Sequence, residues 1–167
     1  EYVAMPPVIL EGLVVVLLMF INGIFAMSEI AVVSARKTRL QQWAEEGDAK
    51  ARAALELANN PNQFLATIQI GITLIGILAG AFGGATIARE LAVILGDITW
   101  LEPYGHLLSL ALVVVVITYL SLIVGELVPK RLALNNPERL AMAIAAPMLA
   151  LSRVAYPAVH LLGLSTE

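Results

Sequence analysis

Long apolar runs alternate with short polar stretches along this chain. The apolar runs cover residues 8–34, 63–88 and 106–128. Each run is long enough, at about 1.5 Å per helical residue, to cross a hydrocarbon core of roughly 30 Å. Residues 64–88 and 107–124 contain no charged side chain. The pattern therefore predicts three transmembrane helices.

The polar stretches predict the connections between these spans. Residues 36–61 are rich in Gln, Glu, Ala, Lys and Arg and predict a pair of short helices outside the membrane. The second connection carries Trp100 and Tyr104, aromatic residues of the kind found at membrane interfaces. We expect it to be a short exit loop.

A fourth apolar stretch, residues 138–164, is interrupted by Pro147, Arg153 and Pro157. As a fourth span it would place Arg153 at mid-depth and accept two prolines, at a cost of several kcal/mol. We predict instead a juxtamembrane helix along the inner interface, with a fourth span as the alternative. The predicted organisation is a transmembrane core over residues 1–137, followed by residues 138–167, which lead toward cytoplasmic domains of a larger protein.

Composition agrees with an all-α integral membrane domain, since 59% of residues are hydrophobic and 14% charged. Cysteine is absent, and His106 and His160 are the two histidines, which disfavours disulfides and zinc or copper centres. A net charge of −3, without basic residues interleaved with aromatics, gives no support for nucleic-acid binding. The N-terminus has no pattern typical of a removable signal peptide. Protease, esterase and P-loop motifs are also missing, so the sequence does not predict an enzyme.

The distribution of basic residues predicts the orientation of the spans in the membrane. Lys and Arg concentrate in the first connection and after the third span, whereas the second connection offers only Arg89. By the positive-inside rule, the N-terminus lies outside and the first connection lies in the cytoplasm. The basic residues on the predicted cytoplasmic side are Arg36, Lys37, Arg39, Lys50, Arg52, Lys130, Arg131 and Arg139.

Glycines recur every fourth residue in the second span, at Gly76, Gly80 and Gly84. This spacing makes a smooth helix face that allows close contact with another helix. Packing within the chain is one explanation. We favour a homodimer interface, because three spans leave few partners for such a face.

The end of the third span, Gly125-Glu126-Leu127-Val128-Pro129-Lys130, combines an acid with a proline. Pro129 cannot donate a hydrogen bond to the carbonyl four residues earlier, which belongs to Gly125. A freed carbonyl and a carboxylate at membrane depth often mark an ion or substrate site. Alternatively, Glu126 pairs with Lys130 at i,i+4 and ends the span.

Polar residues of all three spans lie at a similar depth. Counting from Arg36, Asn62 and Lys130 places Glu29, Gln69 and Glu126 roughly 6 to 10 Å inside the cytoplasmic boundary. Asn22 shares a helix face with Glu29, while Ser28 points about 100° away.

This set of polar side chains offers carboxylate, amide, hydroxyl and carbonyl oxygens, which Mg²⁺ and Ca²⁺ prefer and Na⁺ accepts. We predict a hard-cation site there. Two alternatives remain: the uncharged residues act as interhelical hydrogen bonders, and Glu29 pairs with Arg36.

Three segments resemble the transmembrane domain of the CorC/CNNM (cyclin M) magnesium transporters, with the bacterial CorC branch fitting best. Residues 22–29 read Asn-Gly-Ile-Phe-Ala-Met-Ser-Glu, residues 64–74 read Phe-Leu-Ala-Thr-Ile-Gln-Ile-Gly-Ile-Thr-Leu, and residues 125–130 follow the third span. The resemblance implies a homodimer with three spans and a juxtamembrane helix, and Na⁺-dependent Mg²⁺ export. Full-length relatives continue into CBS modules that bind ATP.

The resemblance also implies a set of ligands. Asn22, Ser28, Gly125 and Glu126 match best, and Glu29 and Gln69 are further candidates. Mg²⁺ would be the transported substrate and Na⁺ the coupling ion. The alternative function is a non-transporting membrane anchor or divalent-cation sensor with a structural ion site.

Overall fold

The computed structural model describes residues 7–96 and 105–165, and all regular secondary structure in those ranges is helical. The all-α prediction is therefore confirmed for the described chain. The predicted exit loop with Trp100 and Tyr104 lies outside the described residues. In chain order, the elements are α1 (Pro7–Ser34), α2 (Lys37–Glu45), α3 (Ala49–Asn59), α4 (Pro61–Gly96), α5 (Gly105–Leu122), the π-helical turn η1 (Ile123–Leu127), α6 (Val128–Asn135) and α7 (Pro137–Leu164).

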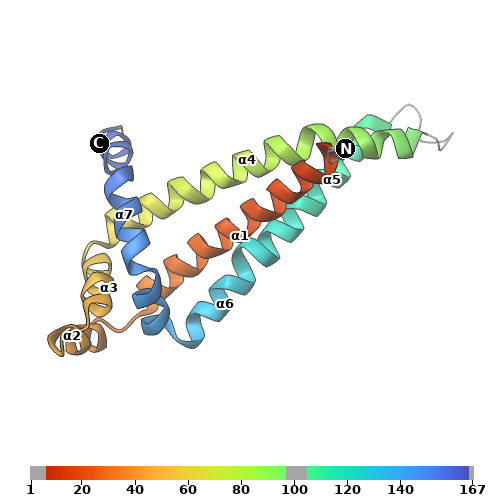
Figure 1. Cartoon of the computed structure of the whole chain (residues 1–167). Helices are drawn as coiled ribbons and strands as arrows, with labels where there is room; N and C mark the ends of the chain where they lie inside the picture. Colours follow the sequence, from red (N-terminus) through yellow and green to blue (C-terminus); the bar gives the residue numbers. More distant parts are fainter. Residues whose placement is uncertain (1–6, 97–104, 166–167) are drawn as a thin grey trace, which may run out of the picture.

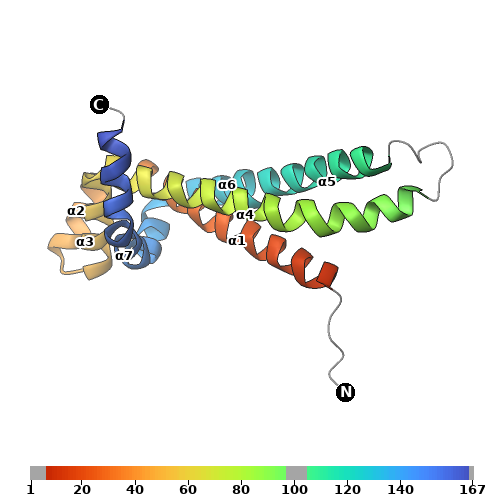
Figure 2. The same ribbon diagram turned by 90° about the horizontal axis from the view of Figure 1, so that it is seen from above.

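Three long rods, α1, α4 and α5 continued by η1 and α6, run side by side (Figures 1 and 2). The start of α1 lies at the same end of the bundle as the end of α4 and the start of α5, while α2, α3 and α7 gather at the opposite end (Figure 1). Large apolar side chains such as Leu17, Ile77 and Val115 remain exposed on the rods. Outward-facing apolar helices are typical of a membrane domain.

Helix α4 is longer than the predicted span 63–88, because it begins at Pro61 and ends at Gly96. The prediction placed the boundary where the first charges appear. Arg89 and Glu90 end the apolar run, but both are good helix formers and do not end the helix.

The two short helices predicted between the first two spans are present as α2 and α3. Gly47 joins them with φ +102°, a left-handed conformation that suits glycine. Asp48 caps α3, since its Oδ1 accepts from the backbone N–H groups of Lys50 and Ala51 at 2.8 and 3.2 Å. Leu40 and Phe64 lie in a buried apolar cluster that joins this pair to α1, α4 and α7. The bundle thus has a packed core at this end.

Helix α7 is continuous through Pro147 and Pro157 and passes across the ends of α1 and α4 (Figure 1). Its first turn is held by an ion pair in which Arg36 Nε donates to Glu138 Oε1 at 2.7 Å. Farther along, Arg153 Nη2 lies 4.0 Å from Glu56 Oε1 on α3. By length and composition, α7 is one of four candidate membrane spans among the described residues. Its charged contacts nevertheless join it to the polar end of the bundle.

Candidate functional site

The third rod contains a π-helical turn just before its proline. The N–H of Val128 donates to the carbonyl of Ile123, five residues back. Pro129 has no N–H to offer the Gly125 carbonyl, yet α6 continues the helix to Asn135. The extra residue of the π turn thus accommodates the proline without ending the rod. Such turns are frequent at functional sites.

Two glycines allow α1 to approach this turn closely. A Cβ on Gly23 would lie 3.0 Å from Pro129 Cγ and 3.2 Å from the Val124 carbonyl oxygen. A Cβ on Gly125 would lie 3.2 Å from Asn22 Nδ2. A larger residue at either position would push the helices apart.

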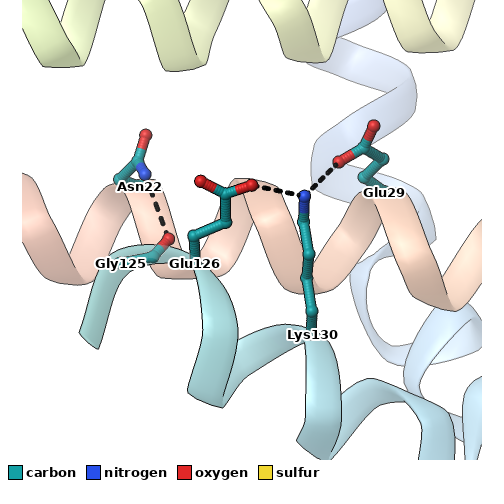
Figure 3. A network of polar contacts seen from close by, with 5 residues as sticks. All are labelled: Asn22, Glu29, Gly125, Glu126 and Lys130. Atoms are coloured by element: carbon teal, nitrogen blue, oxygen red, sulfur yellow. Dashed lines mark hydrogen bonds and ion pairs between the residues drawn. The ribbon is translucent and has the colours of Figure 1, made fainter. Parts of the chain in front are cut away.

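Because the two helices lie so close, Asn22 of α1 forms a hydrogen bond to the π turn. Its Nδ2 donates to the Gly125 carbonyl at 3.0 Å (Figure 3). The carbonyl that Pro129 deprives of its usual helix donor is therefore not left free, as the sequence suggested, but accepts from Asn22. Asn22 Oδ1 is buried and has no hydrogen-bond partner among the described residues. A buried polar atom without a partner is uncommon and points to a missing ligand or water.

Beside this hydrogen bond, Lys130 forms ion pairs with two glutamates. Lys130 Nζ lies 2.8 Å from Glu126 Oε1 and 3.4 Å from Glu29 Oε2. The ion pair between Glu126 and Lys130 that the alternative predicted is thus present, although the helix does not end there but continues to Asn135. The alternative pairing of Glu29 with Arg36 is wrong, because Arg36 binds Glu138 instead. Figure 3 shows Glu126 between Asn22 and the lysine, with these side chains projecting toward α4.

A cavity of about 260 Å³ opens beside Asn22 and Glu126. The hydroxyl residues Thr118 and Ser121 of α5 also border it. Sequence reasoning missed these two residues. Their spacing was a usable signal, since Thr118, Ser121 and Gly125 are at i, i+3 and i+7 on one helix face. The remaining lining residues are Gly76, Ala79, Gly80, Val113, Val114, Ile117 and Leu122.

The predicted ligands Ser28 and Gln69 do not belong to the described lining of the cavity. Ser28 is fully buried, and its hydroxyl donates to the Ile24 carbonyl at 2.6 Å within α1. Gln69 is exposed on α4. Within the described ranges, no group of three or more His, Cys, Asp or Glu side chains is arranged to hold a metal ion. The candidate donors near the cavity are therefore mainly uncharged oxygens around one carboxylate.

Gly23→Ala should weaken the contact between α1 and η1. The added methyl group meets Pro129 and the Val124 carbonyl, and overpacking of this kind costs about 1–3 kcal/mol. We expect a lower thermal unfolding midpoint in detergent, measured by scanning fluorimetry. Gly12→Ala is the matched control on the same helix, because nothing lies within 4 Å of its added Cβ. Equal midpoints for the two variants would contradict the close approach.

Comparison with known proteins gives one family and several relatives. A family model described as the cyclin M transmembrane N-terminal domain matches residues 13–167. The UPF0053 protein sll0260 of Synechocystis is 56% identical over 95% of this chain, and the UPF0053 protein YhdP of Bacillus subtilis is 31% identical over 95%. The polyamine export protein of Haemophilus influenzae is 30% identical over 79%. The chain covers 35%, 36% and 30% of the lengths of these relatives.

Proposed function

Since the chain belongs to the cyclin M transmembrane-domain family, we propose that it carries Mg²⁺ across the membrane. It is a multi-pass membrane protein of a family that is not an enzyme family. The observation that carries the proposal is the buried, unpartnered Oδ1 of Asn22, which lies at a cavity shared with Glu126 and beside the Gly125 carbonyl. An orphaned oxygen among other oxygen donors is what an incoming hard cation requires.

These donors suit Mg²⁺. Mg²⁺ binds oxygen in an octahedron and usually keeps several of its waters, so one or two carboxylates suffice. The cavity of about 260 Å³ has room for a partly hydrated ion, since a water molecule takes about 30 Å³. In the proposed site, Asn22, Gly125 and Glu126 replace part of the hydration shell. Ser28, Glu29 and Gln69 remain predictions that require rearrangement or a second ion.

The proposed mechanism is alternating access driven by Na⁺. Mg²⁺ enters from the cytoplasm, exchanges water for the protein oxygens, and leaves outward as Na⁺ moves in. The basic residues at the end of the bundle that holds α2, α3 and α7 support a cytoplasmic location for that end. The N-terminus would then lie outside the bacterial inner membrane.

We also propose that α7 is a juxtamembrane helix and that α1, α4 and α5 are the three spans. The contact between Arg153 and Glu56 on α3 supports this, because both charges can then lie at the interface. Residues 1–137 form the transport core in this arrangement. The chain spans about a third of the length of the relatives it matches. The family resemblance implies nucleotide-binding CBS domains in full-length relatives, and we propose the same for the full-length protein.

The homodimer remains a proposal based on the glycine face of α4. Gly76 and Gly80 are exposed, and a Cβ on either would meet nothing within 4 Å. Both also border the cavity beside Asn22 and Glu126, so the dimer is tested by its oligomeric state and not by ion binding. The surroundings of Gly84 are not described. Gly80→Leu should block close approach of a second copy and lower the dimer fraction in detergent, measured by light scattering. The exposed Ile77→Leu is a matched control on the same helix, and a Gly80→Leu variant as dimeric as this control would exclude the glycine face.

A second cargo follows from specific observations, and the non-transporting function predicted from the sequence remains the other alternative. The Lys130 ammonium lies between the Glu29 and Glu126 carboxylates, and one relative is named a polyamine export protein, which favours a polyamine as second candidate cargo. A membrane anchor or cation sensor would need the ion site but no flux.

A liposome assay separates these functions. Vesicles containing the protein and a Mg²⁺-sensitive dye are given an imposed Na⁺ gradient, and radiolabelled spermidine is tested in parallel. We expect Na⁺-dependent movement of Mg²⁺ that Glu126→Gln abolishes. Movement of spermidine alone would favour the polyamine function, and movement of neither cargo would favour the anchor.

A further inference from the structure

Glu126 is the carboxylate best placed to bind a cation, and it already forms an ion pair with Lys130. Lys130 Nζ lies 2.8 Å from Glu126 Oε1, and Glu126 borders the cavity where Mg²⁺ is proposed to bind. We propose that the Lys130 ammonium is a tethered competitor for the cation site and must leave Glu126 before a divalent cation binds there. This inference rests on the proposed function.

Charge is the first argument for competition. Glu29, Glu126 and Lys130 together carry one net negative charge. A divalent cation bound to Glu126 while the ammonium stayed in place would put three positive charges beside one carboxylate. The two cations repel each other at such distances, even at an effective dielectric constant of about 20. Each therefore excludes the other from Glu126.

Geometry supplies the second argument, because the ammonium has another partner within reach. Glu29 Oε2 lies 3.4 Å from Lys130 Nζ, on the side away from Asn22 (Figure 3). The lysine side chain is flexible, so a rotation of its end groups can move the charge fully onto Glu29. Asn22 and Gly125 lie on the opposite side of Glu126, where the incoming cation would bind. The displaced ammonium thus stays neutralised without movement of the backbone.

The displacement also changes which helices are linked. Glu126 and Lys130 belong to the same rod, η1 and α6, whereas Glu29 belongs to α1. Binding of the cation therefore replaces an ion pair within one rod by a stronger ion pair between two rods. A bound cation thereby tightens the contact between α1 and α6.

Lys130→Met should tighten Mg²⁺ binding. If the ammonium occupies Glu126 about nine-tenths of the time, its removal raises the apparent affinity about tenfold. Arg131→Met is the matched control, since it removes a neighbouring exposed charge that forms no ion pair in the described part of the chain. Isothermal titration of the detergent-solubilised protein with MgCl₂ measures both variants against wild type.

A second readout follows the lysine directly in wild-type protein. The chain has three lysines, so protein labelled with ¹³C at lysine Cε gives three signals by NMR. Lys37 and Lys50 are exposed and serve as internal references. We expect the Lys130 signal, assigned with Lys130→Arg, to shift as MgCl₂ saturates wild-type protein while the other two stay unchanged.

The outcomes distinguish the inference from the proposed function. Tighter binding by Lys130→Met alone, or a saturable shift of the Lys130 signal, supports competition. Mg²⁺ binding to wild type that leaves the Lys130 signal unmoved, with equal affinities for Lys130→Met and Arg131→Met, overturns competition and leaves the Mg²⁺ site standing. Absence of Mg²⁺ binding in wild type and both variants overturns the proposed site and the competition together.

Discussion

Glu126→Gln should abolish Mg²⁺ binding without unfolding the protein. The substitution keeps the size of the side chain but removes the one carboxylate among the described residues that line the cavity. Two unit charges about 4 Å apart interact by roughly 4 kcal/mol at an effective dielectric constant of 20, and the double charge of Mg²⁺ doubles this energy, so the loss of affinity is on the order of a thousandfold or more. Isothermal titration with MgCl₂ measures the change, and thermal unfolding checks the fold.

Glu45→Gln on α2 is the matched control for this variant. It makes the same change of charge at an exposed glutamate whose carboxylate accepts from Gln41 and lies outside the cavity lining. We expect wild-type affinity from this control. If Glu126→Gln also bound Mg²⁺ as wild type does, Glu126 would be excluded as a ligand and would be only the partner of Lys130.

Asn22→Leu should give the second largest effect. It removes the unpartnered Oδ1 and the donor to the Gly125 carbonyl while keeping a similar branched shape. We expect Mg²⁺ binding to weaken by about tenfold or more. Stability should also fall by about 1–3 kcal/mol, because the Gly125 carbonyl loses its partner. The same titration and unfolding measurements apply.

Asn22→Asp separates the two roles of this side chain. Aspartate keeps an oxygen at the cavity but, when ionised, cannot donate to Gly125. If Asn22 is a ligand, the aspartate variant binds Mg²⁺ at least as well as wild type, although its stability falls. If Asn22 acts only by holding the π turn, both substitutions weaken binding equally.

The helices were predictable because hydropathy dictates them. The apolar run before Ser34 can be satisfied in lipid only by a helix, and the same holds for the segments that became α4 and α5. The ends of the helices were predicted less accurately. A charged residue ends an apolar run without ending a helix, so α4 continues past the predicted boundary to Gly96. The π turn also escaped prediction. Pro129 indicates a disturbed helix, but whether the rod breaks or adds a residue depends on its fit against α1.

The sequence predicted which residues belong to the candidate site better than it predicted which of them contact each other. Asn22, Gly125 and Glu126 were expected together, and the structure brings Asn22 into contact with the π turn. Depth counting could not tell which way Gln69 points on α4, since depth carries no information on the helix face. The contact of Glu29 with Lys130 joins two helices, so it depends on packing that spacing along one helix cannot reveal.

The central claim is that Asn22, Gly125 and Glu126 together hold a divalent cation. Crystals soaked in MnCl₂ test it most directly, because Mn²⁺ replaces Mg²⁺ at oxygen sites and scatters anomalously. We predict an anomalous peak at coordination distance from Glu126 and Asn22 Oδ1, with Lys130 moved toward Glu29. A map without a peak at this cavity, in which Lys130 still binds Glu126, would contradict the account.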